Sequence, residues 1–431
     1  MTRVTRPLAC FYGDDFTGST DAMANFVRWG LSVRLFFDAG LAARATDVDV
    51  VGIAGTARSL QAEAMAGELR PVFKTFDSLR PAVVQYKVCS TFDSSPQVGS
   101  IGKACEVATE VWGPRPIPVL VAQPELGRWT FCGHHFARAG DGQIWRLDRH
   151  PGMAEHPVTP ALDSDLVAVL QRQTQRLPVI SVCRHDLANY PNKARAHRGP
   201  IVLDAIDEAD LRYIGRLLWS SRQGPPLVAV GSGGLSYALG SVLGPGLKLP
   251  RPPSPVGQVL AVSGSYAPET ARQVQEAVAA GWEPVDVAAL GLEASIGTAL
   301  RALRSGRSVV AYSALGTRPM GDGAASGVPG APGSPSGALG QMAAAVLKEH
   351  PVHRLVVAGG DTAGQVMRAI GGDGLDYLTT IAGTSALCTL RAGLCSGKPI
   401  EVVLKGGQIG GPDFFEQVRL ARSSHNGAGH P

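Results

Sequence analysis

Residues 7–30 read PLACFYGDDFTGSTDAMANFVRWG, and this stretch decides the fold class. Residues 7–13 form a short apolar run that ends in glycine, which is typical of a buried strand. The segment from residue 19 onward places apolar side chains at helical spacing. A strand followed at once by an amphipathic helix is the repeating unit of a parallel sheet covered by helices.

The same alternation continues along the chain. Further apolar runs of strand length occupy residues 31–37, 48–55, 82–89, 117–123, 177–182, 200–205 and 226–231, and then residues 258–264, 308–314, 354–360 and 400–407. We therefore predict an α/β fold in which each domain is a mostly parallel sheet flanked by helices. Residues 124–160 interrupt the rhythm with turn-rich sequence, which predicts an irregular insert or a hairpin.

A proline-rich stretch separates the two halves. Residues 244–257 read GPGLKLPRPPSPVG, and five prolines favour an extended connector over a helix or a strand. Because a chain of 431 residues exceeds the usual size of one core, we predict domains over residues 1–246 and 257–431, joined by a linker over residues 247–256. Within the second domain, residues 316–337 consist mainly of Gly, Pro, Ala and Ser, which predicts a flexible surface loop.

Composition excludes several classes of function. The formal charge of +4 is small and no Lys/Arg run is present, so we expect no nucleic-acid partner. Seven cysteines lie scattered without a C-x-x-C pair, which argues against a disulfide framework and a structural zinc site, and favours a reducing cytoplasm. No apolar stretch reaches the roughly 18 residues of a membrane span, so we expect no membrane partner and a cytoplasmic location.

Three glycine-containing turns follow strand predictions in the C-terminal half, at residues 262–270, 357–366 and 404–415. Helix N-termini at such turns offer unpaired N–H groups and a partial positive charge that suit phosphate. Lys405 could add a point charge there. Turn chemistry alone also explains a glycine after a strand, and neither the P-loop nor the dinucleotide fingerprint is present.

The motif GDDFTGSTD at residues 13–21 contains two adjacent carboxylates at the end of a predicted strand. We expect Thr17, Ser19 or Thr20 to cap the following helix, with Asp21 in its first turn. Capping does not explain the adjacent pair Asp14 and Asp15. Such a pair could bind hydroxyl groups, accept a hydroxyl proton or hold Mg²⁺.

Two more predicted strands end in polar residues. Arg58 and Lys87 would suit a substrate carboxylate, and Ser90 and Thr91 would bind hydroxyl groups. Surface charge and capping are the alternative explanation. Histidines 134, 135, 150 and 156 lie near Cys132, but their spacing matches no zinc pattern, so we expect them to be structural or exposed.

Taken together, these motifs resemble those of a known family. GDDFTGSTDA, VSGSYAPETARQV, AGGDTAGQVMRAIG and VLKGGQIGGPDFF, with HPVTPALDSDL between them, are similar to the motifs of the four-carbon acid sugar kinase family, in the same order along almost the whole chain. The resemblance implies an ATP-dependent kinase with a sugar-acid-binding first domain, a nucleotide-binding second domain and an active site in the cleft between them.

The resemblance also implies roles for individual residues. Asp14, Asp15, Arg58 and Lys87 would line the substrate site, where Asp14 or Asp15 would deprotonate the acceptor hydroxyl and the two cations would anchor the carboxylate. The implied nucleotide contacts are Ser265, Gly360, Asp361, Thr362, Ala363 and Gly407, and the charge of Lys405 would add to them. Mg²⁺ would accompany ATP, and no protein metal ligand is assigned. The acceptor would be the terminal (C4) hydroxyl of a threonate, an erythronate or a 3-oxo-tetronate.

One segment departs from the family pattern. Where most members read KKxDSTLRGNIG, residues 86–102 read YKVCSTFDSSPQVGSIG, so that Cys89 replaces an aspartate and FDSSP replaces Leu-Arg-Gly. The loss of an arginine and the gain of Asp93 should change which acid fits. This departure favours a divergent subgroup, and the branched acid 3-oxo-isoapionate is one candidate substrate.

Two other functions stay open at this point. A non-catalytic sensor of sugar acid or nucleotide would need the same binding residues but would release no ADP. An NAD-linked dehydrogenase would act on the same acids, but the dinucleotide fingerprint is missing. The expected partners are a small sugar acid and ATP, and homo-oligomerisation is open.

Overall fold

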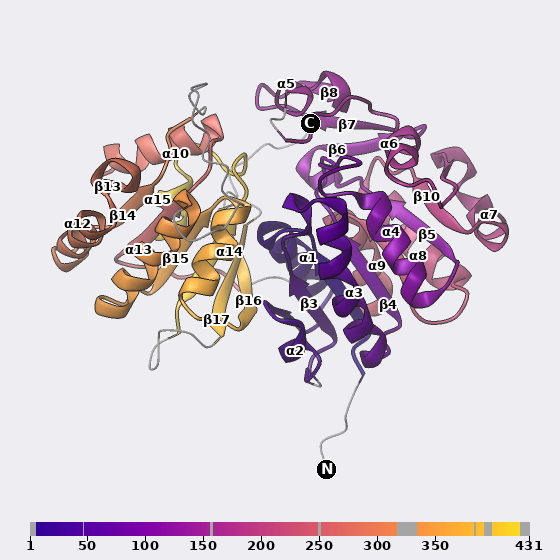
Figure 1. Ribbon diagram of the computed structural model, residues 1–431, viewed down its shortest axis with the longest axis horizontal. Helices are drawn as coiled ribbons and strands as arrows, with labels where there is room; N and C mark the ends of the chain where they lie inside the picture. Colours follow the sequence, from indigo (N-terminus) through magenta and orange to yellow (C-terminus); the bar gives the residue numbers. More distant parts are fainter. Residues whose placement is uncertain are drawn as a thin grey trace, which may run out of the picture. The chain divides into compact units, whose positions relative to one another are not determined.

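The structure is a computed structural model that describes residues 6–45, 47–155, 158–248, 251–316, 334–382, 385–391 and 399–422. The chain divides into two compact units, Met1–Lys248 and Leu249–Pro431. Each unit is an α/β domain whose sheet is flanked by helices (Figure 1). The predicted fold class is therefore confirmed.

The first unit contains a parallel sheet with the strand order β2-β3-β1-β4-β11-β5-β10-β9. Its strands are β1 (Ala9–Gly13), β2 (Val33–Phe36), β3 (Val50–Ala54), β4 (Val83–Lys87), β5 (Pro116–Leu120), β9 (Ile180–Val182), β10 (Gly199–Leu203) and β11 (Leu227–Gly231). All eight apolar runs predicted in this half form strands. Most of their residues are fully buried, because a sheet covered on both faces tolerates few polar side chains.

The helices of the first unit cover both faces of this sheet. They are α1 (Phe16–Arg28), α2 (Ala39–Ala42), η1 (Ala57–Ser59), α3 (Ala62–Leu79), α4 (Ile101–Trp112), α6 (Leu166–Gln173), η4 (Arg184–Asn189), α7 (Tyr190–Ala196), α8 (Glu208–Ser221) and α9 (Gly233–Leu243). Helices α1, α8 and α9 pack together, and α3, α4 and α6 form a second group. The side chains of the second group join those of the strands in a continuous apolar core.

The insert between β5 and β9 is more regular than the sequence predicts. Strands β6 (Arg128–Phe131), β7 (His134–Arg138) and β8 (Ile144–Arg146) form an antiparallel sheet, so the hairpin alternative is confirmed. Three short helices, η2 (Pro124–Leu126), η3 (Leu147–Arg149) and α5 (Pro151–Ala154), complete the insert.

The second unit has the strand order β13-β14-β12-β15-β18-β17-β16. Its strands are β12 (Val259–Ser263), β13 (Glu283–Asp286), β14 (Val309–Tyr312), β15 (Arg354–Ala358), β16 (Gly374–Ile381), β17 (Ser385–Arg391) and β18 (Glu401–Lys405). The pairs β17–β18 and β16–β17 are antiparallel and the others are parallel. Strands β13, β16 and β17 were not predicted, because their mixed polar residues form no continuous apolar run.

The helices of the second unit are α10 (Pro268–Ala279), α11 (Val287–Leu290), α12 (Leu292–Arg304), α13 (Pro335–Glu349), α14 (Gly360–Ala369) and α15 (Phe414–Leu420). Helix α13 packs against α12 and α14, and α10 packs against α15. The predicted loop over residues 316–337 extends too far, because Ser334 caps α13 and its last residues are helical. Residues 317–333 of that loop, like His156 and Cys395, lie outside the described residues. None of the described helices combines the length and apolarity needed to cross a bilayer.

Candidate active site

Charged side chains gather where β1, β3 and β4 end. Asp14 follows β1 directly, Lys87 is the last residue of β4, and Arg58 lies in η1 just beyond β3. Strand β1 pairs with β3 on one side and β4 on the other, both in parallel, with Gly13 opposite Ala54 and Lys87. The carboxyl ends of three parallel strands therefore meet at one edge of the sheet, where ligands of such sheets bind.

Arg58 joins the two adjacent carboxylates. Its Nη2 lies 2.6 Å from Asp14 Oδ1, its Nε lies 3.2 Å from Asp14 Oδ2, and its Nη1 lies 2.7 Å from Asp15 Oδ2. Burial raises the pKa of Asp14 to about 6, the Arg58 charge opposes this rise, and the Asp15 charge adds to it. A guanidinium has five N–H donors, so Arg58 has two more to offer a ligand.

Asp15 also caps helix α1. Its Oδ1 accepts a hydrogen bond from Gly18 N at 2.6 Å and its Oδ2 accepts one from the Thr17 hydroxyl at 2.9 Å. The expectation that Thr17, Ser19 or Thr20 caps the helix is wrong, and Asp21 lies beyond the first turn, because the helix begins at Phe16. Asp15 follows an extended strand and has the β-region backbone of a cap residue.

Lys87 is 2% exposed and faces helix α1. Its Nζ lies 3.1 Å from Asp21 Oδ2 and donates to the carbonyl of Val88 at 3.2 Å. Gln123 Nε2 donates to Asp21 Oδ1 at 2.9 Å. Sequence reasoning missed Asp21 and Gln123 as site residues. The signal for Gln123 was available, because it is the last residue of the predicted strand over residues 117–123.

The absence of a side chain at Gly18 leaves room at the centre of this cluster. A Cβ atom there would lie 2.5 Å from Asp15 Oδ1, 3.2 Å from Lys87 Nζ and 3.6 Å from Arg58 Nη2. Both predicted cations therefore approach the same point beside the first turn of α1. The structure thus brings together Asp14, Asp15, Arg58 and Lys87, as the sequence predicts.

Ser90 and Thr91 lie in the loop after β4. The Thr91 hydroxyl donates to Asp93 Oδ1 at 2.8 Å and lies 2.9 Å from Cys89 Sγ. The loop lines a cavity of about 80 Å³ that also touches the insert. Phe92 has a φ of +58°, a left-handed backbone that is rare for an aromatic residue. The loop therefore carries hydroxyl, thiol and carboxylate groups in contact with one another.

His135 of β7 holds this loop from the insert. Its ring is fully buried, with Nε2 at 2.8 Å from the Ser90 carbonyl and Nδ1 at 3.0 Å from the Thr130 hydroxyl. Burial lowers the pKa of His135 to about 4, so the ring stays neutral. His134 bonds to Ser164, and His150 caps α5. These described histidines are structural, as expected from their spacing.

In the second unit, glycines allow three loops to approach one another closely. A Cβ atom on Gly264 would lie 2.1 Å from Thr362 Oγ1, and one on Gly407 would lie 2.5 Å from Ser265 Oγ. Gly359 has a φ of +109°, which only glycine adopts readily. The loops after β12, β15 and β18 thus form one cradle, which we call the glycine cradle.

Two helices begin at the glycine cradle without a side-chain cap. Gly359 precedes α14 and Ala267 precedes α10, and neither provides a capping oxygen. Helices α1, α4 and α8 of the first unit are capped by Asp15, Ser100 and Asp207. An uncapped helix start favours an anion, because its first-turn N–H groups and the helix dipole attract negative charge. Ser265, Gly360, Asp361, Thr362, Ala363 and Gly407 all belong to these loops and helix starts.

Lys405 ends β18 beneath the same loops. It is 1% exposed, its Nζ donates to the Thr270 hydroxyl at 3.0 Å, and that hydroxyl donates to the Gly407 carbonyl at 2.6 Å. No carboxylate among the described residues pairs with it in an ion pair. Burial lowers the pKa of Lys405 to about 7, against the opposing charge of Glu269.

A buried hydroxyl beside the glycine cradle has no partner among the described residues. Ser263 Oγ, at the end of β12, is fully buried and neither donates a hydrogen bond to a described residue nor accepts one from it. Together with the close glycine contacts and the uncapped helix starts, this group fits a polyphosphate ligand such as the triphosphate of ATP.

Comparison with known proteins gives two family matches. Residues 9–239 match a model described as a sugar-binding N-terminal domain, and residues 260–415 match one described as a nucleotide-binding C-terminal domain. The chain is 36% identical to the 3-oxo-isoapionate kinase of Paraburkholderia graminis, over 96% of this chain and 94% of the relative. It is 31% identical to the 3-oxo-tetronate kinase of Pseudomonas fluorescens, over 96% of each chain.

A crystal structure from Salmonella typhimurium LT2 has a similar fold. Its TM-score is 0.75 at 22% sequence identity, and the match covers 95% of this chain and 98% of that one. At this level of identity the likeness concerns the fold alone.

Proposed function

Because the chain belongs to the four-carbon acid sugar kinase family, we propose that it transfers the γ-phosphoryl group of ATP to the terminal hydroxyl of a small sugar acid. The observation that carries this proposal is the Asp14–Arg58–Asp15 cluster at the carboxyl edge of the first sheet. We assign acid binding to residues 1–246 and nucleotide binding to residues 257–431, with residues 247–256 as the linker.

We assign the role of general base to Asp14. A base works best when its pKa is near the working pH, and burial brings the pKa of Asp14 to about 6. As the acceptor oxygen attacks the γ-phosphorus in line, its proton passes to an Asp14 oxygen, the new O–P bond forms, and the bond to ADP breaks. Asp15 holds Arg58 and the start of α1 in place and is therefore a positioning residue.

The acid's carboxylate would bind to the cations of the cluster. Arg58 is 23% exposed at its side chain and has two N–H donors left after binding both aspartates. Lys87 has one donor left after Asp21 and Val88. Ser90 and Thr91 would bind hydroxyl groups of the acid. This arrangement favours acids over neutral sugars, because a bidentate carboxylate–guanidinium pair is a strong contact.

The glycine cradle would hold the triphosphate. First-turn N–H groups of α10 and α14, the Ser265 and Thr362 hydroxyls and Lys405 would contact phosphate oxygens, with Gly360, Asp361, Ala363 and Gly407 forming the walls. Mg²⁺ accompanying ATP would neutralise part of the negative charge on the transferred phosphoryl group.

The proposal is tested by measuring ADP release with ATP, Mg²⁺ and a panel of sugar acids. The panel contains threonate, erythronate, 3-oxo-tetronates and the branched 3-oxo-isoapionate. We expect rapid release with one class of acid and little release without any acid. Binding of an acid in calorimetry without ADP release from any member would instead support a non-catalytic sensor. The divergent loop at residues 89–96 and the 3-oxo-isoapionate kinase relative favour the branched acid.

Lys405→Met should weaken ATP binding about tenfold, because it removes a buried positive charge near the phosphates. Below its pKa of about 7, Lys405 is charged and attracts the triphosphate; above that value it is neutral. The wild-type dissociation constant for ATP should therefore rise as the pH passes upward through 7, and the variant should show a flatter dependence. Calorimetry one pH unit on each side of 7 measures both effects.

The control for this prediction is Lys348→Met, which changes a lysine in the last turn of α13. It should leave the ATP dissociation constant and its pH dependence as in the wild type. An unchanged ATP affinity in Lys405→Met at both pH values would remove Lys405 from the nucleotide site.

A further inference from the structure

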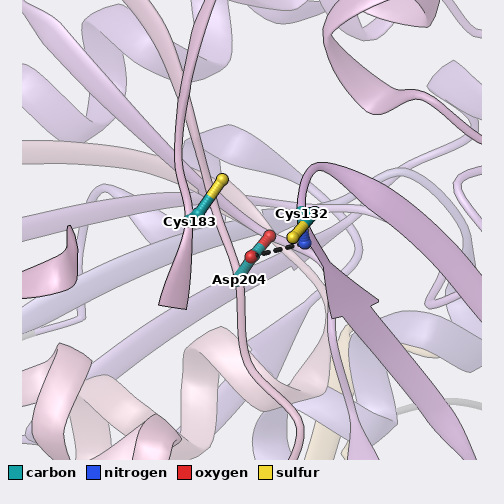
Figure 2. Close-up of side chains that lie close together, drawn as sticks. All are labelled: Cys132, Cys183 and Asp204. Atoms are coloured by element: carbon teal, nitrogen blue, oxygen red, sulfur yellow. Dashed lines mark hydrogen bonds between the residues drawn. The ribbon is translucent and has the colours of Figure 1, made fainter. Parts of the chain in front are cut away.

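Three potential metal ligands meet outside the candidate active site. Cys132 Sγ, Cys183 Sγ and a carboxylate oxygen of Asp204 all lie within 4.8 Å of one another (Figure 2). Cys132 is exposed, Cys183 is half-buried and Asp204 is fully buried. Among the described residues this is the group of cysteine, histidine and acidic side chains whose spacing suits a metal ion.

The sheet places two of the three ligands side by side. Asp204 follows β10 directly and Cys183 follows β9 directly, and these strands pair in parallel with Leu203 opposite Val182. The residues after the strand ends therefore emerge together at the carboxyl edge of the sheet.

Asp204 brings the third ligand to the same place. Its Oδ2 accepts hydrogen bonds from Cys132 N at 2.6 Å and Arg184 N at 3.0 Å, and its Oδ1 accepts one from Gly133 N at 2.9 Å. Cys132 lies in the β6–β7 turn with a φ of +49°, so its thiol is fixed in an uncommon backbone conformation next to the carboxylate.

We propose that Cys132, Cys183 and Asp204 form a binding site for a thiophilic divalent cation of the zinc class. Two thiolates and a carboxylate are a ligand set that zinc accepts, with water in the fourth position. Binding releases one proton from each thiol, and the sulfur–metal bonds form as the S–H bonds break. Metal–ligand bonds of about 2.0–2.3 Å require the three atoms to move closer by roughly 1 Å.

The surroundings favour a cation over a disulfide. A disulfide between the two cysteines would leave the charge of the fully buried Asp204 carboxylate as it is. A dication would instead compensate the negative charge of the carboxylate and both sulfurs. Three backbone N–H groups donate to the Asp204 carboxylate and fix its orientation. Hydrogen bonds from surrounding groups orient metal ligands in the same way.

The site would fix the insert against the sheet. The turn that carries Cys132 leads into β7, where His135 contacts the Ser90 carbonyl of the proposed substrate loop. A bound cation would therefore stabilise the hairpin that supports this loop. Metal binding itself does not depend on the proposed kinase function and can be measured without any substrate.

The test titrates the reduced, chelator-treated full-length protein with Co²⁺ and then displaces it with Zn²⁺. We expect a thiolate-to-cobalt absorption band that saturates at one equivalent, and a higher melting temperature with Zn²⁺. Cys132→Ser and Cys183→Ser should each lose the band and bind the metal at least tenfold more weakly. Cys89→Ser, which changes a half-buried thiol outside the cluster, should keep both the cobalt band and the wild-type metal affinity.

Asp204→Asn is a further variant, because its amide oxygen can still accept hydrogen bonds from the backbone N–H groups. It should weaken Zn²⁺ binding but keep the cobalt band, since both thiols remain. The proposal is wrong if the wild type shows no saturable band, or if the two cysteine variants bind as the wild type does. It is equally wrong if oxidation joins Cys132 and Cys183 in a disulfide, with the loss of two hydrogens, while the reduced protein binds no metal. A failure of the kinase assay would change none of these readouts.

Discussion

Asp14→Asn is expected to lower the turnover number by about 10²–10⁴-fold while leaving the ATP dissociation constant within about twofold of the wild type. An asparagine keeps the shape and one hydrogen-bond acceptor for Arg58 but cannot accept the hydroxyl proton. The loss corresponds to about 3–5 kcal/mol of transition-state stabilisation. Steady-state kinetics with the best sugar acid and calorimetry with ATP separate the two quantities.

The pH dependence gives an independent readout of the same residue. Asp14 must be ionised to act as a base, and its pKa is about 6, so the wild-type rate should fall as the pH drops through that value. The residual rate of Asp14→Asn should not show this fall. An aspartate whose ionisation does not affect turnover would not produce the difference.

Two further variants make the assignment to Asp14 specific. Asp47→Asn breaks an exposed pair with Arg34 at 2.8 Å and should leave turnover unchanged. Asp15→Asn removes part of the α1 cap and one Arg58 contact, and should reduce turnover less than Asp14→Asn does. A larger loss in Asp15→Asn would make Asp15 the base, and near wild-type rates in both variants would exclude a catalytic carboxylate at this cluster.

Gly407→Ala is expected to raise the ATP dissociation constant by about 10- to 100-fold, or roughly 1.4–2.7 kcal/mol. The new Cβ would lie 2.5 Å from Ser265 Oγ and 3.0 Å from Ala267 Cβ. In the wild type, Ala267 N at the start of α10 donates a hydrogen bond of 3.2 Å to the Ser265 hydroxyl. In the variant the hydroxyl must move away, and this hydrogen bond breaks. Both the hydroxyl and the space for a phosphate are lost from the glycine cradle.

The matched control is Gly411→Ala in the same loop, where the new Cβ would meet its nearest atom at 3.5 Å, an ordinary contact. Its ATP affinity should equal that of the wild type. Calorimetry with the sugar acid alone should give the same dissociation constant for both variants, since the proposed acid site lies in the first unit. Equal ATP affinity of Gly407→Ala and the wild type would contradict a nucleotide site at the glycine cradle.

Much of the fold follows from local patterns. Each continuous apolar run of the first unit became a buried strand, because a parallel sheet covered on both faces leaves little room for polar side chains. The strands with mixed polarity, such as β13 and β16, escaped prediction because their pairing depends on neighbours far along the chain. Helix starts were less predictable: the cap of α1 is Asp15, although three hydroxyl residues follow it.

The candidate site, too, was only partly predictable from local patterns. The sequence placed Asp14, Asp15, Arg58 and Lys87 at strand ends, and the common edge of a parallel sheet is enough to bring them near one another. It did not indicate that Arg58 holds both aspartates, or that Lys87 pairs with Asp21. Those contacts depend on strand order and on the close approach of α1 allowed at Gly18.

The sequence by itself determined the α/β class, the parallel strands and the residue types at the ends of those strands, because period and polarity are local properties of a chain. Only the tertiary structure decided the partners of the charged and thiol groups. Cys132, Cys183 and Asp204 show this clearly, since their wide spacing matches no sequence pattern and predicts no metal site. They meet because β9 and β10 are neighbours and the Asp204 carboxylate binds the β6–β7 turn.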